Sequence, residues 1–77
     1  MTMLDDARAL IAEAIGRAPE SVPDTAQAGS LEGWDSLAHM RLILALEARI
    51  GRTLDSAEIV GLLSLRDVAV LVAGRPH

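Results

Sequence analysis

Gly33-Trp34-Asp35-Ser36-Leu37 marks the point where a loop passes into a long apolar helix. Asp35 is a favoured N-cap residue, and its carboxylate can accept a hydrogen bond from a free backbone N–H of the first turn. Ser36 then occupies the first helical position, with a hydroxyl that capping does not require. Because a helix N-terminus carries partial positive charge and unpaired N–H groups, it suits a phosphate. Ser36 is therefore a candidate attachment point for a phosphate-linked group.

The helix that begins at Ser36 is expected to run to Ile50 and to stop at Gly51. At about 100° per residue, one side of this helix gathers Leu42, Ile43, Leu46 and Ile50. The nearly opposite side gathers Leu37, Met40 and Leu44, which we call the outer stripe. A surface helix needs only one apolar stripe. Either this helix is buried on two sides, or the outer stripe is kept for a partner.

A first helix is predicted over Met3 to Ile15, with Thr2 as its cap. Its core-facing stripe and the apolar positions beside it are Leu4, Ala7, Ile11, Ile15, Leu10 and Ala14. From Arg17 to Asp35 no period is sustained, and proline and glycine recur, which indicates a long loop. Val22 and Leu31 are the expected anchors of this loop.

Two shorter helices are expected to follow. The third runs from Ser56 to Gly61, with Asp55 or Ser56 as its cap, and the fourth opens with a Ser64–Asp67 capping box and continues through Val72. The residues expected to face the core are Ile59, Val60, Val68, Leu71 and Val72. The fold class is therefore all-α: a small four-helix bundle of three main helices and a short third one, with a long loop between helices 1 and 2.

All 77 residues are expected to form one domain, 1–77, because a chain of this length has no room for two cores. Trp34 is the single aromatic residue, so the core must be mainly aliphatic. The absence of cysteine excludes disulfides, thiolate catalysis and cysteine metal sites. With no apolar run of spanning length and no secretory leader, we expect a cytoplasmic protein that does not enter a membrane. Because the chain begins with Met1 and has one-domain size, a free-standing protein is expected.

The net charge of −4, with no lysine and seven arginines spread along the chain, argues against nucleic-acid binding. A helix-turn-helix DNA binder is excluded by this charge and by the lack of a cationic recognition helix. Basic patches on partner enzymes are the better electrostatic expectation, because opposite potentials speed encounter.

Several residues near the start of the second helix are candidates for function. No residue beside Ser36 could activate its hydroxyl, so no catalytic residue is assigned and any chemistry there must come from another protein. We interpret His39 as a half-buried histidine bonded to the long loop rather than as a ligand or base. His77 has no ligand-spaced partner, so no metal site is expected. Trp34 is interpreted as a loop anchor over the helix start, where it would border any attached group. The outer stripe could pack under the loop, but contact with a partner is favoured.

At these residues the chain resembles an acyl carrier protein, or thiolation domain. The Asp35-Ser36-Leu37 triplet matches the hallmark of that family, at the start of the second helix after a long loop. The similarity covers essentially the whole chain, and its other matching positions are Leu42, Ala45-Leu46-Glu47, Ile50, Thr53-Leu54, Ile59 and Leu65-Arg66-Asp67-Val68.

The resemblance implies a monomeric, non-enzymatic four-helix carrier whose Ser36 receives 4′-phosphopantetheine from coenzyme A. A separate, magnesium-dependent phosphopantetheinyl transferase would attach this arm. A loading ligase or transferase would then place an acyl or aminoacyl group on the arm as a thioester, for presentation to downstream synthase enzymes. The residues assigned to docking of these partners are Trp34, Asp35, Leu37, Met40, Arg41, Leu44 and Glu47.

One departure from the family bears on the pathway. Carriers of bacterial fatty-acid synthesis have an acidic second helix, whereas this helix has Ala38, Arg41 and Ala48 at the corresponding positions, keeps Glu47 and adds Arg49. This favours a specialised pathway, such as polyketide, nonribosomal peptide or modified-sugar assembly. Two alternatives stay open: an unmodified helical protein–protein adaptor, and a fatty-acid carrier with an atypical second helix.

Overall fold

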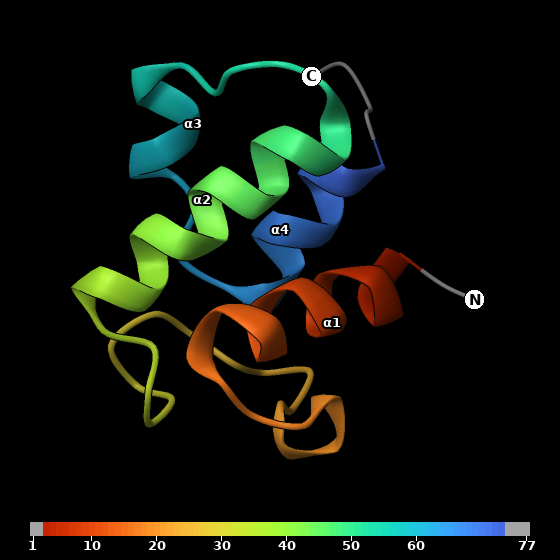
Figure 1. The fold of residues 1–77 in the computed structure, drawn as a ribbon, viewed down its shortest axis with the longest axis vertical. Helices are drawn as coiled ribbons and strands as arrows, with labels where there is room; N and C mark the ends of the chain where they lie inside the picture. The colour runs from red at the N-terminus through yellow and green to blue at the C-terminus, as the bar shows by residue number, and fades with distance from the viewer. Residues whose placement is uncertain (1–2, 74–77) are drawn as a thin grey trace.

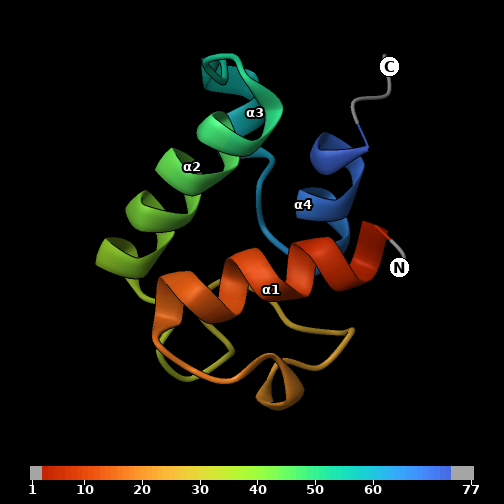
Figure 2. The ribbon, with the colours of Figure 1, turned by 45° about the vertical axis from the view of Figure 1, so that its right-hand side comes forward.

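The computed structural model describes residues 3–73, and these form α-helices joined by loops, with no strand among them. The helices are α1 (Met3–Ile15), α2 (Ser36–Ile50), α3 (Ser56–Val60) and α4 (Leu65–Val72), with a 3₁₀ turn, η1, at Pro19–Ser21. α1 contacts both α2 and α4, which also contact each other; it crosses below them in Figure 2. In Figure 1 the short α3 lies beyond α2, away from α1. The predicted all-α bundle is confirmed, and the predicted cap Thr2 lies outside the described residues.

The two longest helices have the predicted bounds and bury the predicted faces. In α1, Ala7, Ile11 and Ala14 are buried, and the other three predicted residues pack against the core half-buried. In α2, Leu42 and Leu46 are fully buried, and both other members of that stripe pack against the core. Replacing a leucine at such a site by alanine costs about 2–5 kcal/mol. These two apolar faces therefore position α2 and its N-terminus.

α3 ends one residue earlier than predicted, and the prediction that Val60 points inward is wrong, since its side chain is 74% exposed. Ile59 and Val60 are consecutive and lie about 100° apart around the helix axis. A helix this short therefore turns only one of them toward the core. Ile59 packs there, and Leu62, which follows the helix, is fully buried.

The caps of α3 and α4 are among the predicted residues, but the capping box predicted for α4 is incomplete. Asp55 caps α3 with a capping box, in which its carboxylate accepts from Glu58 N–H at 2.8 Å and Glu58 accepts from Asp55 N–H at 3.0 Å. Ser64 caps α4, but the predicted capping box with Asp67 is only half formed. The Asp67 carboxylate accepts from the Ser64 hydroxyl and from Leu63 N–H, both at 3.0 Å. Asp67 therefore closes the turn before α4.

The core face of α4 is broader than predicted. Val68 and Leu71 are buried and Val72 is half-buried, as the spacing indicates. Leu65 and Ala69 are also buried, which the sequence analysis did not anticipate. The backbone of Leu65 also joins α4 to the long loop, because its N–H donates a hydrogen bond to Ala26 O at 3.0 Å.

The long loop is fixed to the helices at several points. Val22 is buried and Leu31 packs half-buried against the core, as predicted, and Ala26 and Trp34 are buried as well. The loop also pairs with the segment before α4, through an isolated antiparallel bridge between Gln27 and Ser64.

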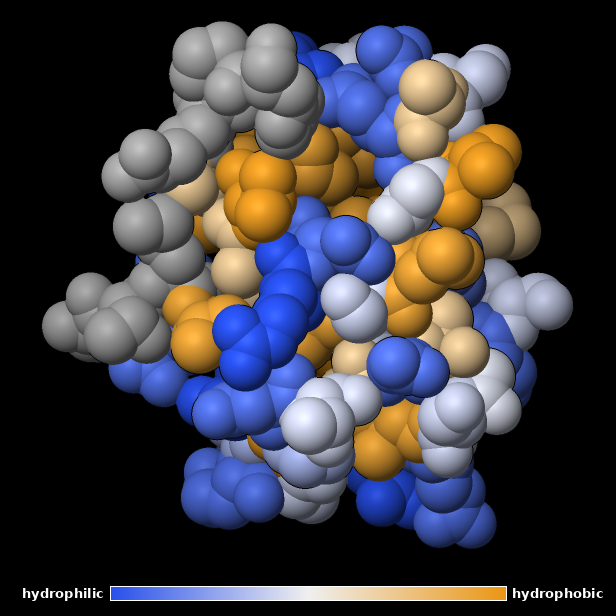
Figure 3. Space-filling model, turned by 180° about the vertical axis from the view of Figure 1, so that it is seen from behind, coloured by the Kyte–Doolittle hydropathy of each residue, from blue (hydrophilic) through white to orange (hydrophobic). Residues whose placement is uncertain are grey.

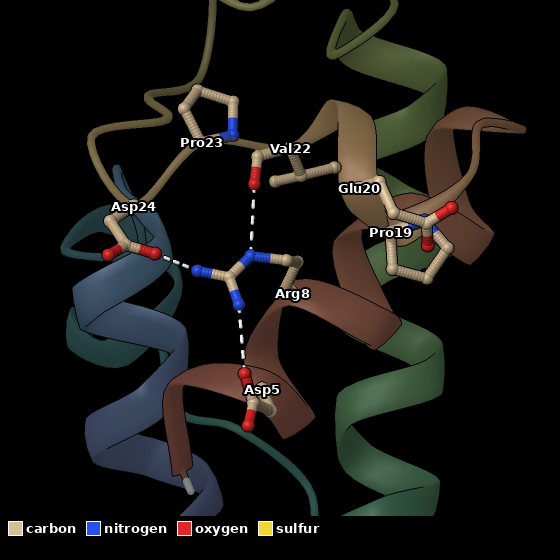
Figure 4. A pocket seen from close by; sticks show the side chains of 7 residues that line it. All are labelled: Asp5, Arg8, Pro19, Glu20, Val22, Pro23 and Asp24. Atoms are coloured by element: carbon tan, nitrogen blue, oxygen red, sulfur yellow. Dashed lines mark hydrogen bonds and ion pairs between the residues drawn. The ribbon is translucent and has the colours of Figure 1, made fainter.

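Arg8 of α1 holds the first part of this loop (Figure 4). Its Nε donates to Val22 O at 3.0 Å, and its Nη1 donates to Asp5 at 2.9 Å. The remaining terminal nitrogen pairs with Asp24. The guanidinium thus joins α1 to both sides of the turn that follows η1, and the loop approaches α2 along a defined path.

Candidate functional site

The start of α2 has the predicted cap. Asp35 is in extended conformation, with φ −96° and ψ −171°, and its Oδ1 accepts a hydrogen bond from Ala38 N–H at 2.9 Å. Ser36 is the first residue of the helix and is exposed. Its hydroxyl has no hydrogen-bond partner among residues 3–73. The structure therefore presents a free alcohol at the positive end of a helix.

The backbone before this cap is held by a compact turn. Trp34 N–H donates to Leu31 O at 3.0 Å, and Trp34 O accepts from Gly29 N–H at 3.2 Å. Gly33 has φ +94°, a conformation that residues other than glycine rarely adopt. A β-carbon there would meet no atom closer than 3.5 Å, so the requirement for glycine is conformational rather than steric.

Trp34 is 2% exposed, in agreement with its interpretation as a loop anchor. Its indole Nε1–H donates to His39 Nδ1 at 2.9 Å, and the two ring centroids are 6.1 Å apart. His39 is half-buried and bonded to the long loop, as predicted. Since the indole lies below the surface, Trp34 can serve docking only by supporting the helix start.

A shallow hollow of about 510 Å³ lies beside the Ser36 hydroxyl. The long loop, the first turn of α2 and the segment before α4 all contribute to it, and its lining residues are Ala28, Gly29, Trp34, Asp35, Ser36, His39 and Leu63. Most of the exposed area of this wall is apolar, so the hollow is better suited to an uncharged group than to a charged one.

The outer stripe of α2 is not covered by the loop. Leu37, Met40 and Leu44 are 58%, 63% and 65% exposed, so the interpretation that they pack under the loop is wrong. The reverse face in Figure 3 shows apolar side chains at several separate points between polar ones. Other large exposed apolar side chains include Val60, Leu63 and Val70. The outer stripe differs from these in continuing directly from Ser36 along one helix.

The chain is acidic overall, but the charge beside the outer stripe is positive. Four arginines form ion pairs: Arg8 with Asp5 and Asp24, Arg17 with Glu32, Arg49 with Asp6, and Arg52 with Glu58. Within residues 3–73, Arg41 and Arg66 have no ion pair. Arg41 lies beside the outer stripe, so the exposed face of α2 carries a free cation.

The one acidic residue of α2 is engaged elsewhere. Glu47 is half-buried, and its Oε2 accepts a hydrogen bond from Leu54 N–H at 2.9 Å. Glu47 is among the residues that the sequence assigns to docking, and no sequence pattern predicts its contact with Leu54, because a pairing across the α2–α3 turn follows no helical or strand period. The sequence indicates that His39 bonds the long loop, but it does not identify Trp34 as the partner.

Comparison with known proteins agrees with this geometry. The sequence model of a family described as the phosphopantetheine attachment site matches residues 5–72, which include every helix after the first residues of α1. No curated protein matches the chain. Among the described residues no helix combines the length and apolar character that crossing a membrane requires. The family match spans most of the chain, and the protein therefore belongs to the phosphopantetheine attachment site family.

Proposed function

We propose that this protein carries acyl or aminoacyl groups as thioesters on a 4′-phosphopantetheine arm attached to Ser36, and presents them to partner enzymes. The family is defined by a covalently attached 4′-phosphopantetheine, so the open question is which residue holds it. The observation that carries the assignment is the exposed Ser36 hydroxyl, which is left without a partner because Asp35 performs the capping.

The attachment is a phosphoryl transfer in which a phosphoanhydride bond is replaced by a phosphodiester. The Ser36 oxygen bonds to the phosphorus that bears the pantetheine of coenzyme A, the phosphoanhydride bond breaks, and adenosine 3′,5′-bisphosphate leaves. The proton of the hydroxyl must pass to a base. Asp35 and His39 are the candidate bases in the first turn of α2, but Asp35 Oδ1 accepts the Ala38 N–H and His39 Nδ1 accepts the indole N–H of Trp34. The base is therefore supplied by the transferase, and this chain acts as substrate and carrier rather than as enzyme.

The arm supplies a thiol, and the residues of this chain supply its placement. The helix N-terminus favours the phosphodiester electrostatically. The hollow lined by Trp34, His39 and Leu63 offers an apolar wall beside the arm's attachment point. A cytoplasmic location forms part of this proposal, since the thiol must stay reduced between loading steps.

We further propose a carrier of a specialised pathway, such as polyketide or nonribosomal peptide assembly. Support comes from the outer stripe and from Arg41, which together give α2 an apolar face with a free cation. Glu47, which could have supplied negative charge, is engaged by Leu54 N–H. A fatty-acid carrier that docks through an acidic second helix fits this surface less well.

The test begins with purified apo protein, coenzyme A, magnesium and a broad-specificity phosphopantetheinyl transferase. Intact mass spectrometry should show the gain of one phosphopantetheine group, and Ser36→Ala should show none. Ser30→Ala is a matched control, because Ser30 is also exposed but lies within the long loop. Lack of modification of the wild-type protein, or modification that persists in Ser36→Ala, would contradict the assignment. In that case an unmodified adaptor that uses the outer stripe is the better interpretation.

A further inference from the structure

The first turn of α2 contains a side-chain bond that spans the proposed attachment residue. Trp34 lies two residues before Ser36 and His39 lies three residues after it, and their rings are joined by the 2.9 Å hydrogen bond from indole Nε1 to imidazole Nδ1. Two further bonds span the same serine: Asp35 Oδ1 accepts from Ala38 N–H, and Asp35 O accepts from His39 N–H, both at 2.9 Å. Ser36 itself contributes no side-chain bond to this arrangement.

The Trp34–His39 bond is directional in a way that apolar anchoring would not be. An aliphatic or phenyl anchor could fill the same space and rotate, whereas a buried indole N–H requires an acceptor. Among the described residues no buried side-chain nitrogen or oxygen lacks a partner. The acceptor role also defines the imidazole orientation, because Nδ1 rather than Nε2 faces the indole N–H. His39 therefore fixes the orientation of the ring pair as well as its position.

This ring pair forms part of the wall beside the reacting hydroxyl. Trp34, Ser36 and His39 all line the same hollow. The backbone of Trp34 is held in turn by Leu31 and Gly29. The position of Ser36 is thus set from the loop side and from the helix side, and the Trp34–His39 bond joins the two beside the Asp35 cap.

We propose that His39 is a positioning residue for arm transfer, which holds Trp34 through Nδ1 and thereby fixes the Ser36 hydroxyl for attack on coenzyme A. This inference rests on the proposed function of Ser36. It assigns His39 no contact with the reacting atoms. Because a displacement of about 1 Å in a reacting group can cost about 10²-fold in rate, loss of this bond should act on turnover more than on binding of the carrier.

The main comparison is between His39→Leu, which removes the acceptor, and His39→Asn, whose amide oxygen can take the place of Nδ1. Steady-state kinetics with a phosphopantetheinyl transferase should show kcat lower by about tenfold for His39→Leu, with KM within about twofold of wild type. His39→Asn should restore kcat to within about threefold of wild type. Equal kcat for wild type and His39→Leu, or an equal loss in both variants, would overturn the proposal. A loss confined to KM would overturn it as well, since it would make His39 a docking residue.

Two further measurements separate positioning from a general loss of folding. Trp34 is the only tryptophan and the chain has no tyrosine, so the fluorescence of the protein reports on the surroundings of the indole that donates this bond. The emission of His39→Leu should differ from wild type while its far-UV circular dichroism remains helical, and that of His39→Asn should lie close to wild type. An unchanged Trp34 emission in His39→Leu would contradict the proposal.

A double-mutant cycle with Trp34→Phe tests the same bond from the donor side. Once the indole N–H is absent, His39→Leu should lower kcat by less than twofold further, because the two substitutions remove one shared interaction. Fully additive losses would overturn the proposal. The mass of Ser36→Ala distinguishes the two failures: a modified Ser36→Ala variant contradicts the site itself, whereas an unmodified one, together with an unaffected His39→Leu, contradicts only the role of His39.

Discussion

Oε2 of Glu47, in the last turn of α2, accepts a hydrogen bond from the backbone N–H of Leu54 at 2.9 Å. Leu54 is buried, and it lies in the segment that leads from α2 to α3. The carboxylate therefore satisfies a backbone donor that would otherwise have to be buried without a partner. The only acidic residue of α2 thus serves the fold through one of its carboxylate oxygens.

We expect Glu47→Ala to lower the free energy of unfolding by about 1–3 kcal/mol, because Leu54 N–H loses its acceptor. Glu47→Gln should cost less than about 1 kcal/mol, since the amide oxygen can accept the same bond. Chemical denaturation measures both. The rate of arm transfer to Glu47→Gln should stay within twofold of wild type. A large kinetic loss in this folded variant would instead assign the negative charge of Glu47 to docking.

Arg41 is the exposed cation beside the outer stripe, and its positive charge should favour docking. The acidic composition of the chain indicates the opposite, a partner with a basic surface. We expect Arg41→Glu to lower kcat/KM with the enzyme that loads the carrier in its own pathway by about fivefold, or about 1 kcal/mol. Arg66→Glu is a matched control, because it makes the same charge change on α4, at another exposed arginine that forms no ion pair within residues 3–73. Faster loading of Arg41→Glu would show that the partner presents a basic surface.

Arg8 joins α1 to the turn after η1, and its removal should loosen the long loop. We expect Arg8→Met, which keeps the apolar stem but not the donors, to destabilise the protein by about 2 kcal/mol. Amide hydrogen exchange should accelerate most in residues 18–26, whereas α2 should retain its protection. Arg66→Met provides the comparison for a surface arginine without such contacts. Uniform acceleration in both variants, or none in Arg8→Met, would show that the guanidinium does not hold the loop.

The helical period predicted α1 and α2 to the residue, because each has a continuous apolar stripe and ends at a glycine that adopts positive φ. The same reasoning failed at Val60, where α3 is too short for a period to distinguish inward from outward positions. It also missed η1, since a single 3₁₀ turn after a proline leaves no repeat to detect.

At the candidate site, local rules predicted the cap and the free hydroxyl of Ser36, because both depend only on neighbours within one turn. Contacts that depend on the path of the loop were harder to predict. Tertiary packing, rather than any repeat in the sequence, produces the pairing of Glu47 with Leu54. It also fixes the path of the long loop, which Arg8 holds at Val22 and Ser64 holds at Gln27. The exposed outer stripe lay between these cases: the sequence identified its residues but not whether the loop covered them.

Leu44 and Leu46 lie two residues apart on α2, and their replacement by alanine should affect different properties: stability at Leu46 and docking at Leu44. Leu46 is fully buried between the helices, so Leu46→Ala should destabilise the protein by about 2–5 kcal/mol. Leu44 is 65% exposed on the outer stripe, so Leu44→Ala should change stability by less than about 0.5 kcal/mol. Leu44→Ala should nevertheless raise the KM of the loading enzyme, by about fivefold if the leucine enters an apolar groove on the partner. Thermal denaturation and loading kinetics should be measured on both variants. An unchanged KM in a stable Leu44→Ala protein would show that the outer stripe is not part of the docking surface. A large loss of stability in Leu44→Ala would show instead that the outer stripe belongs to the core.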